Sequence, residues 1–303
     1  MSAPEGAPPA TVAYRCGYAA IVGRPNVGKS TLLNRLVGQK LSITSKKAQT
    51  TRHRVTGIVT TRDSQIAFVD TPGFQSKHRS GLNTRMNRAV TQSLADVDAI
   101  LLVVEAGRIT DADRAVVALL PKGARAVAVV NKTDRLKDKD SLLPQMAALS
   151  EQFPFAAIIP VSAEKDRSLD TVVAEIGALL PGGPAMFDAD AVTDRDERFF
   201  AAELLREKVF RLLGDEVPYA TTVVIDRFVE EEALRRIQAT IYVDRDNQRA
   251  ILLGAGGAQM KEIASAARAD MERLYGGPVF LEVWVRVKRG WADDEAQLTR
   301  FGY

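Results

Sequence analysis

Short apolar runs alternate with helical patterns through the first 180 residues. Apolar runs such as Ala19 to Val22 indicate buried strands, and apolar residues three or four positions apart indicate helices. Strands are predicted over residues 19–22, 55–61, 65–69, 99–104, 125–130 and 157–161, and helices over 29–37, 82–94, 111–120 and 169–180. This order predicts an α/β domain with a doubly wound, mostly parallel sheet, which binds its ligand at the carboxyl ends of the strands.

The second half has a different order of elements. The pattern predicts a helix over 197–213, strands over 221–228 and 237–243, a short helix over 249–253, a helix over 258–274 and a strand over 279–287. The first of these helices is expected to have one apolar side, made by Phe200, Leu204, Leu205 and Leu212. In the strand over 237–243, apolar residues alternate with polar ones, so Gln238, Thr240 and Tyr242 are expected to face away from the core.

A break in the pattern separates the two halves. Pro181-Gly182-Gly183-Pro184 interrupts the last helix of the first half, and the acidic stretch that follows is typical of a linker. We therefore predict a disordered tail over 1–14, a first domain over 15–181, a linker over 182–196 and a second domain over 197–303. Two domains agree with the length of 303 residues.

Composition and charge exclude some classes of protein. No apolar run approaches the roughly 20 residues that span a bilayer, and the single cysteine, Cys16, favours a reducing compartment, so we expect a cytoplasmic protein. Residues 1–190 carry 24 basic and 18 acidic side chains, whereas residues 191–303 carry 17 and 20. Bulk charge therefore does not support nucleic-acid binding by the second domain, and such binding needs a local basic patch.

A glycine-bounded loop joins the first strand to the first helix. Its sequence is Gly23-Arg24-Pro25-Asn26-Val27-Gly28-Lys29-Ser30, followed by Thr31. Strand, loop and helix are the context that the pattern G-x-x-x-x-G-K-[ST] requires, because successive backbone N–H groups and the helix N-terminus then point at one phosphate chain. Lys29 is expected to reach the β- and γ-phosphates, and the Ser30 hydroxyl to bind Mg²⁺.

Two further motifs fit a site that hydrolyses a nucleotide. The polar loop over 40–54 contains adjacent threonines, one of which can complete the Mg²⁺ shell only while the γ-phosphate is present. Thr51 is the first candidate and Thr50 the second. Asp70 ends a strand and is expected to hold Mg²⁺ through water, while Gly73 lets its backbone N–H approach the γ-phosphate.

The run Asn131-Lys132-Thr133-Asp134 ends another strand and predicts recognition of guanine. A carboxylate at Asp134 can accept hydrogen bonds from N1–H and the 2-amino group of guanine. Adenine offers neither donor, and losing such buried pairs discriminates by roughly 10⁴-fold. Asn131 is expected to brace the phosphate loop, the Lys132 stem to pack on the base, and a backbone N–H of Ser162-Ala163 to bind guanine O6. The ligands predicted are GTP and GDP.

Phe74 stands where many GTPases have a glutamine that positions the attacking water. Its side chain cannot polarise water, so we assign hydrolysis to Asn26, Lys29, Thr51 and Gly73. GTPases with this substitution resemble one another in having an asparagine at the position of Asn26. In some of them that residue helps to hold K⁺, which makes K⁺ a candidate cofactor.

A second glycine loop, Gly254-Ala255-Gly256-Gly257, lies between two predicted helices. In an α+β domain with this order of elements it matches the G-x-x-G loop of the type II KH fold, which clamps single-stranded RNA. A plain helix-turn-helix is the alternative. Because the two inner residues are not basic, we assign phosphate contact to backbone N–H groups and Lys261. Three further candidates for RNA contact lie at the end of the last strand: Arg286, Lys288 and Arg289. The alternative is that these side chains form a solvated strand end without a binding role.

Residues 15–303 as a whole resemble the Era family of GTPases. The matching stretches are the phosphate loop, residues 47–54, 70–73 and 131–134, and Gly290-Trp291-Ala292-Asp293-Asp294-Glu295. The resemblance implies a P-loop GTPase domain followed by a KH domain that binds single-stranded RNA at the 3′ end of small-subunit ribosomal RNA and acts in assembly of the small ribosomal subunit. It also implies peripheral association with the inner face of the cell membrane, although the sequence contains no recognisable anchor. We expect a monomer.

Other GTPase classes fit the sequence less well. A tandem-domain GTPase would carry two phosphate loops, and a tRNA-modifying GTPase would carry a C-terminal cysteine motif. The remaining alternative is a nucleotide-gated binding switch, associated with RNA or membrane, that has negligible turnover. Phe74 gives this alternative some support.

Overall fold

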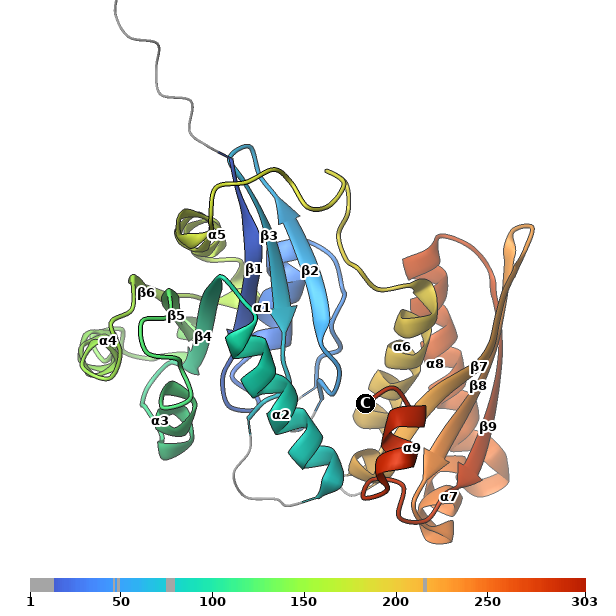
Figure 1. Ribbon diagram of the computed structural model, residues 1–303. Helices are drawn as coiled ribbons and strands as arrows, with labels where there is room; N and C mark the ends of the chain where they lie inside the picture. Colours follow the sequence, from blue (N-terminus) through green and yellow to red (C-terminus); the bar gives the residue numbers. More distant parts are fainter. Residues whose placement is uncertain (1–13, 46, 48–49, 75–79, 215–216) are drawn as a thin grey trace, which may run out of the picture.

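The computed structural model describes residues 14–45, 47, 50–74, 80–214 and 217–303, which form two domains with separate sheets (Figure 1). The first sheet has six strands in the order β2-β3-β1-β4-β5-β6, and the second has three in the order β7-β8-β9. The predicted fold class is confirmed: an α/β domain with a mostly parallel sheet is followed by an α+β KH domain.

The first sheet is parallel except for β2, which runs antiparallel to β3. Its strands are β1 Arg15–Val22, β2 Val55–Thr60, β3 Ser64–Asp70, β4 Ala99–Glu105, β5 Ala126–Asn131 and β6 Ala157–Pro160. Since β3 and β4 flank β1 on opposite sides, the strand order reverses at β1. The loop after β1 therefore opens at the point where such sheets bind ligands.

Helices cover both faces of this sheet. They are α1 Lys29–Val37, α2 Gly81–Ala95, α3 Asp111–Val117, α4 Leu142–Ser150 and α5 Leu169–Leu179. One apolar core joins the sheet to α1 and α5, and the other joins it to α2, α3 and α4. The sequence pattern missed α4, because Pro144 stands in its first turn and Leu143 is 72% exposed, so its apolar residues do not follow one face.

The second domain packs three helices on one face of its sheet. Its elements are α6 Glu197–Leu212, β7 Thr221–Glu231, β8 Leu234–Val243, α7 Asp246–Leu253, α8 Ala258–Tyr275, β9 Val279–Val287 and α9 Glu295–Arg300. Strand β8 runs antiparallel to β7 and parallel to β9. Thr240 faces away from the core, as predicted, since its neighbours Ala239 and Ile241 are the core residues. It is nevertheless only 1% exposed, and its hydroxyl donates to Asp226 Oδ2 at 2.7 Å.

Helix α6 does not have the single apolar face that its sequence suggested. Leu204 and Leu205 enter the core of the second domain, but Glu203, Arg206 and Glu207 on its other faces are also buried. Leu212, expected on the apolar side, is 37% exposed. The reason is visible in Figure 1, where α6 lies between the sheet of its own domain and the first domain. Both sides of the helix are therefore covered by protein.

The end of the chain returns to the first domain. Asp294 caps α9 by accepting from the backbone N–H groups of Ala296 and Gln297, and Trp291 is fully buried. Leu82 and Met86 of α2 pack with Trp291 and Leu298 in a small apolar cluster. Helix α9, which the sequence analysis did not predict, thus ties the second domain to α2.

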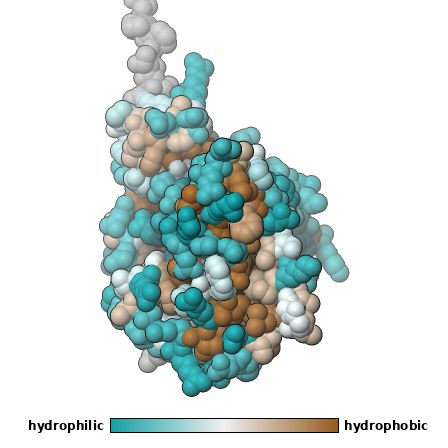
Figure 2. Space-filling model, turned by 90° about the vertical axis from the view of Figure 1, so that its right-hand side faces the viewer, coloured by the Kyte–Doolittle hydropathy of each residue, from teal (hydrophilic) through white to brown (hydrophobic). Residues whose placement is uncertain are grey.

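The outer face of the second sheet carries exposed apolar side chains. Hydrophobic residues gather down the middle of this face (Figure 2). Strand β9 contributes Phe280 and Trp284, which are 45% and 42% exposed. Among the described residues, no helix combines the length and hydropathy that a bilayer span requires.

Candidate functional site

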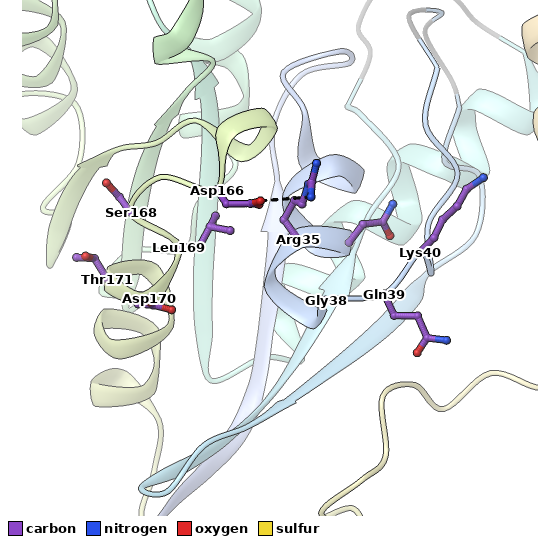
Figure 3. A pocket seen from close by; sticks show the side chains of 10 residues that line it. Arg35, Gly38, Gln39, Lys40, Asp166, Ser168, Leu169, Asp170 and Thr171 are labelled. Atoms are coloured by element: carbon purple, nitrogen blue, oxygen red, sulfur yellow. Dashed lines mark hydrogen bonds and ion pairs between the residues drawn. The ribbon is translucent and has the colours of Figure 1, made fainter. Parts of the chain in front are cut away.

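The predicted nucleotide-binding motifs meet at one edge of the first sheet. The phosphate loop follows β1, Asp70 ends β3, Asn131 ends β5 and Ser162 follows β6. A cleft of about 790 Å³ opens there between the phosphate loop and residues 43–45, 47, 50 and 51. It is separate from the 630 Å³ hollow of Figure 3, between the end of α1 and the start of α5, where Arg35 contacts Asp166 at 3.3 Å.

Two glycines allow the phosphate loop to pack tightly. Gly28 precedes α1 with φ of 100°, a left-handed conformation that favours glycine. A Cβ atom there would lie 2.4 Å from Asn131 Nδ2, and one on Gly23 would lie 2.3 Å from the Val103 carbonyl oxygen. Side chains at these positions would push the loop away from the sheet and from the ligand.

Lys29 is buried at the start of α1, with its ammonium group inside the curve of the loop. Nζ donates to the carbonyl oxygens of Gly23 at 3.0 Å and Arg24 at 3.1 Å. Burial lowers the pKa of Lys29 to about 8. An anionic phosphate chain next to this group would favour its charged form. Thr31, the next residue but one, lines the same cleft.

Four oxygen-bearing side chains converge next to Lys29. Ser30 Oγ lies 2.7 Å from both Thr51 Oγ1 and Asp70 Oδ2. Ser42 Oγ, which the sequence analysis missed, donates to Asp70 Oδ2 at 2.7 Å. Burial raises the pKa of Asp70, and its Oδ1 atom has no hydrogen-bond partner among the described residues. Hydroxyl and carboxylate oxygens with one unsatisfied acceptor fit Mg²⁺, which prefers oxygen ligands.

The two adjacent threonines differ in where they point. Thr51 Oγ1 reaches the oxygen cluster, whereas Thr50 Oγ1 donates to the Lys47 carbonyl oxygen of its own loop at 2.7 Å. The geometry therefore favours Thr51 as the metal ligand, although both threonines line the cleft.

Gly73 approaches the phosphate loop closely. A Cβ atom on Gly73 would lie 2.8 Å from backbone atoms of Pro25, so a larger residue would force the two loops apart. Phe74 packs instead against the core that faces α2, α3 and α4. Its ring turns away from the cleft and leaves the water-positioning role to other groups.

The base-recognition residues are linked to the phosphate loop by hydrogen bonds. Asn131 Nδ2 donates to the Val27 carbonyl oxygen at 2.9 Å, and Lys132 Nζ donates to the Asn26 carbonyl oxygen at 2.5 Å. Lys132 also pairs with Glu105 Oε1 at 2.9 Å. The bracing expected of Asn131 is thus shared with Lys132.

Asp134 is not among the residues that line the cleft, and one of its carboxylate oxygens is held by a hydrogen bond. Ser162 Oγ donates to Asp134 Oδ1 at 2.6 Å, and this hydrogen bond lowers the pKa of Asp134. The carboxylate is therefore ionised at pH 7. A backbone N–H of Ser162-Ala163 was expected to bind guanine O6; that of Ala163 donates to Asn131 Oδ1 at 3.1 Å. A contact to O6 would have to share this N–H.

The Arg24 side chain is not among those that line the nucleotide cleft. It pairs with Glu105 at 2.9 Å and with Asp113 at 3.1 Å, and Asp113 in turn caps α3. Burial alone would raise the pKa of Glu105, but hydrogen bonds from Lys132 and Arg24 lower it. Glu105 and Asp113 escaped sequence analysis because each lies outside a motif.

The second domain contributes to the wall of the nucleotide cleft. Phe210 and Arg211 of α6 line it together with the loop over 40–54. Arg211 donates to the Thr44 carbonyl oxygen at 3.2 Å, and Lys40 pairs with Glu207 at 2.5 Å. These α6 residues lie far outside the nucleotide motifs, so no sequence signal identified them.

Residues next to Thr51 anchor the second domain. Arg52 is 3% exposed and donates to the carbonyl oxygens of Pro218, Tyr219 and Thr221 at 2.6–3.1 Å. The His53 ring stacks on Tyr303, with 4.7 Å between ring centroids. One short segment therefore touches both the metal site and the second domain.

His53 is expected to make stability fall in acid. Burial lowers its pKa to about 4, against 6.5 in an unfolded chain. The unfolded state thus takes up the proton first, and stability is lost as pH falls from 6.5 towards 4. The loss from this residue reaches about 2 kcal/mol by pH 5. His53→Phe keeps a ring for stacking, and urea unfolding at pH 7.5 and 5 should show a smaller pH effect than in wild type. Equal pH effects in both proteins would contradict the prediction.

The glycine loop of the second domain exposes its backbone. Gly254, Gly256 and Gly257 have φ of 70°, 57° and 83°. Ala255, Gly256 and Lys261 are exposed, as are Arg286, Lys288 and Arg289. Arg289 pairs with Asp246 at 3.0 Å. Arg286 alternates along β9 with core-facing valines, so it lies on the outer sheet face and not beside the glycine loop.

No group of three His, Cys, Asp or Glu side chains able to hold a metal occurs in the described parts of the chain. Residues 18–132 match the family of 50S ribosome-binding GTPases, and residues 216–292 match the KH domain family.

Relatives match over nearly the full length. GTPase Era of Nitrosomonas eutropha is 56% identical, with 96% of this chain and 98% of the relative covered. GTPase Era of Xanthomonas axonopodis pv. citri is 53% identical, with coverage of 97% and 98%.

Two solved structures share the whole fold. One is a variant of Aquifex aeolicus Era bound to GDP and AlF₄⁻, with a TM-score of 0.91, 38% identity, and coverage of 95% of this chain and 99% of that one. The other is Era with MgGDPNP and nucleotides 1506–1542 of 16S ribosomal RNA, with a TM-score of 0.92, 37% identity, and coverage of 96% and 99%. With curated relatives above 50% identity along almost its full length, the chain belongs to the Era family and is a GTPase.

Proposed function

We propose that the chain hydrolyses GTP while its KH domain binds single-stranded RNA at the 3′ end of small-subunit ribosomal RNA, and that it acts in small ribosomal subunit assembly. The observation that carries this proposal is the continuity of Thr51 and Arg52. Thr51 joins the Mg²⁺ oxygen cluster, and Arg52 holds the backbone of the second domain. The nucleotide and the RNA-binding domain thus share one loop.

The nucleotide site supplies position and charge. Backbone N–H groups of the phosphate loop and the N-terminus of α1 would bind the phosphates, with Lys29 at the β- and γ-phosphates. Ser30, Thr51 and Asp70 would hold Mg²⁺, which when bound neutralises charge on the phosphate oxygens. Gly73 would offer its N–H to the γ-phosphate. The roles of these residues and of Asn26 in hydrolysis remain those assigned from the sequence.

RNA binding is supported by the KH fold and by a relative. The related Era structure contains nucleotides 1506–1542 of 16S ribosomal RNA. In this chain the exposed loop over 254–257 and Lys261 would clamp the RNA backbone. We propose that the protein acts in the cytoplasm as a monomer on the small subunit, with any membrane contact peripheral.

GTP and RNA are expected to bind cooperatively. Losing the γ-phosphate would free Thr51, and the adjacent Arg52 would then be less firmly held against the second domain. We expect RNA affinity to be 5- to 150-fold higher with a non-hydrolysable GTP analogue than with GDP, the range of roughly 1–3 kcal/mol that is typical of coupling between sites. Thr51→Ala should remove the difference. RNA titrations under both nucleotides measure it.

Thr50→Ala is the matched control, because the Thr50 hydroxyl donates to the Lys47 carbonyl oxygen of its own loop. It should retain the difference between the two nucleotides. Equal RNA affinities in wild type would mean that the domains are merely tethered. A difference that survives Thr51→Ala would assign the sensing role to another residue.

The alternative is a nucleotide-gated switch with negligible turnover. Phe74 favours this alternative, because its apolar ring packs against the core and cannot position an attacking water. Single-turnover hydrolysis of GTP distinguishes the two: release of phosphate without a partner contradicts the alternative.

A further inference from the structure

A cleft of about 560 Å³ lies between the two domains, next to residues 52–54 and separate from the nucleotide cleft. Its walls come from that loop, the start of α6, the start of β7 and the last residues of the chain, which lie between α2 and α6 in Figure 1. The described lining residues include six arginines and two acids: Arg52, Arg54, Arg195, Arg198, Arg206, Arg300, Asp196 and Glu203.

The base of this cleft holds more positive than negative charge. Glu203 pairs with Arg206 through two contacts of 2.7 Å, whereas the partners of Arg52 in the described part of the chain are carbonyl and hydroxyl oxygens. Among the described residues, Arg52 Nε and Arg206 Nη1 are buried without an acceptor. His53 beside them is neutral at pH 7. An uncompensated charge in a low-dielectric interior makes the potential of the adjoining cleft positive.

The mouth of the cleft combines exposed guanidinium groups with aromatic rings. Arg195 lies 4.9 Å from the Phe199 ring and is exposed, as is Arg300 at the end of α9. Phe301 and Tyr303 line the same wall. Guanidinium groups bind phosphates in a forked geometry, and aromatic faces stack on bases. This pairing of side chains is typical of surfaces that bind single-stranded nucleic acid.

We propose that the cleft between the domains binds phosphate groups of the RNA strand beyond the part held by the KH loop. The inference rests on the proposed function. One KH groove clamps about four nucleotides, so an RNA of the length proposed continues past it. The second half of the sequence carries a net negative charge. The local basic patch that RNA binding requires is thus assembled from both domains, with Arg54 contributed by the first and Arg195 and Arg300 by the second.

The test compares two RNAs on a variant with three substitutions, Arg54→Gln, Arg195→Gln and Arg300→Gln. One RNA has about four nucleotides, the length of one KH groove, and the other covers the nucleotide 1506–1542 segment. Dissociation constants are measured over a series of salt concentrations with a GTP analogue bound. For the long RNA, the slope of log K against log salt should become shallower by about 2, at about 0.7 per lost phosphate contact. The slope for the short RNA should not change.

The matched control removes the same charge from exposed sites away from the cleft, through Arg62→Gln, Lys122→Gln and Lys139→Gln. It should leave both slopes unchanged. GDP affinity and thermal unfolding report whether each variant is folded, and Arg300→Gln alone, with an expected change of about 0.7, serves if the triple variant is unstable.

Other results would overturn the proposal in distinguishable ways. An unchanged slope for the long RNA means that the cleft does not contact it, and equal changes for both RNAs mean that the arginines act through the KH groove. If wild type binds neither RNA, the proposed function itself fails. If GDP-saturated wild type binds tripolyphosphate, the triple variant does not, and RNA binding is the same in both, the cleft takes a small anion instead.

Discussion

Asp134→Asn is expected to convert the nucleotide preference from guanine towards xanthine. The amide keeps one oxygen, which can still accept from Ser162 Oγ, now 2.6 Å from the carboxylate. It presents an NH₂ group to the 2-oxo group of xanthine in place of an acceptor for the guanine donors. Unpaired polar groups in such a pocket cost roughly 10⁴-fold in specificity. Competition between GTP and XTP for the protein measures the ratio.

Asp140→Asn provides the control, because Asp140 is an exposed carboxylate on the same loop. It should leave the preference for GTP unchanged. If Asp134→Asn also keeps full preference for GTP, another residue reads the base.

Potassium is expected to accelerate GTP hydrolysis about a hundredfold over sodium. Phe74 is half-buried against the core and cannot position water, and Asn26 is exposed in the phosphate loop, where its amide oxygen is a ligand type that K⁺ binds. One well-placed positive charge contributes on the order of 3 kcal/mol to a developing anion, which corresponds to this factor. Asn26→Ala should remove most of the difference, measured as single-turnover rates in KCl and NaCl.

The backbone at Asn26 requires a second variant. Its φ of 65° is left-handed, so alanine there is strained whether or not a cation binds. Asn26→Gly removes the amide without that strain and should also lose the potassium effect. Retention of the effect in the glycine variant would show that only loop geometry matters. Equal wild-type rates in both salts would favour an activating group from a partner.

The sequence predicted what depends on local pattern. The phosphate loop, Asp70 and the run from Asn131 to Asp134 each follow a buried strand, and parallel strands bring their carboxyl ends to one edge. Their convergence could therefore be predicted before any side chain was placed. The order of elements around the second glycine loop likewise predicted the KH fold.

Contacts between distant segments could not be predicted in this way. Ser42 reaches Asp70 across 28 positions, and Arg211 lines the nucleotide cleft from the other domain. Helix α6 looked amphipathic because only its apolar side has a periodic signal. In the sequence, Glu203, Arg206 and Glu207 look like a solvent-exposed face of the helix. In the structure they are buried, because the loop before β2 packs on them.

Helix α6 also determines how the molecule can be divided. A fragment that stops at the linker would keep every nucleotide motif but lose Phe210 and Arg211 from the cleft wall and the Glu207 partner of Lys40. The complementary fragment would place Glu203 and Arg206 in water. The cooperative folding unit therefore crosses the covalent domain boundary, and hydrogen exchange along α6 should report which nucleotide is bound to the other domain.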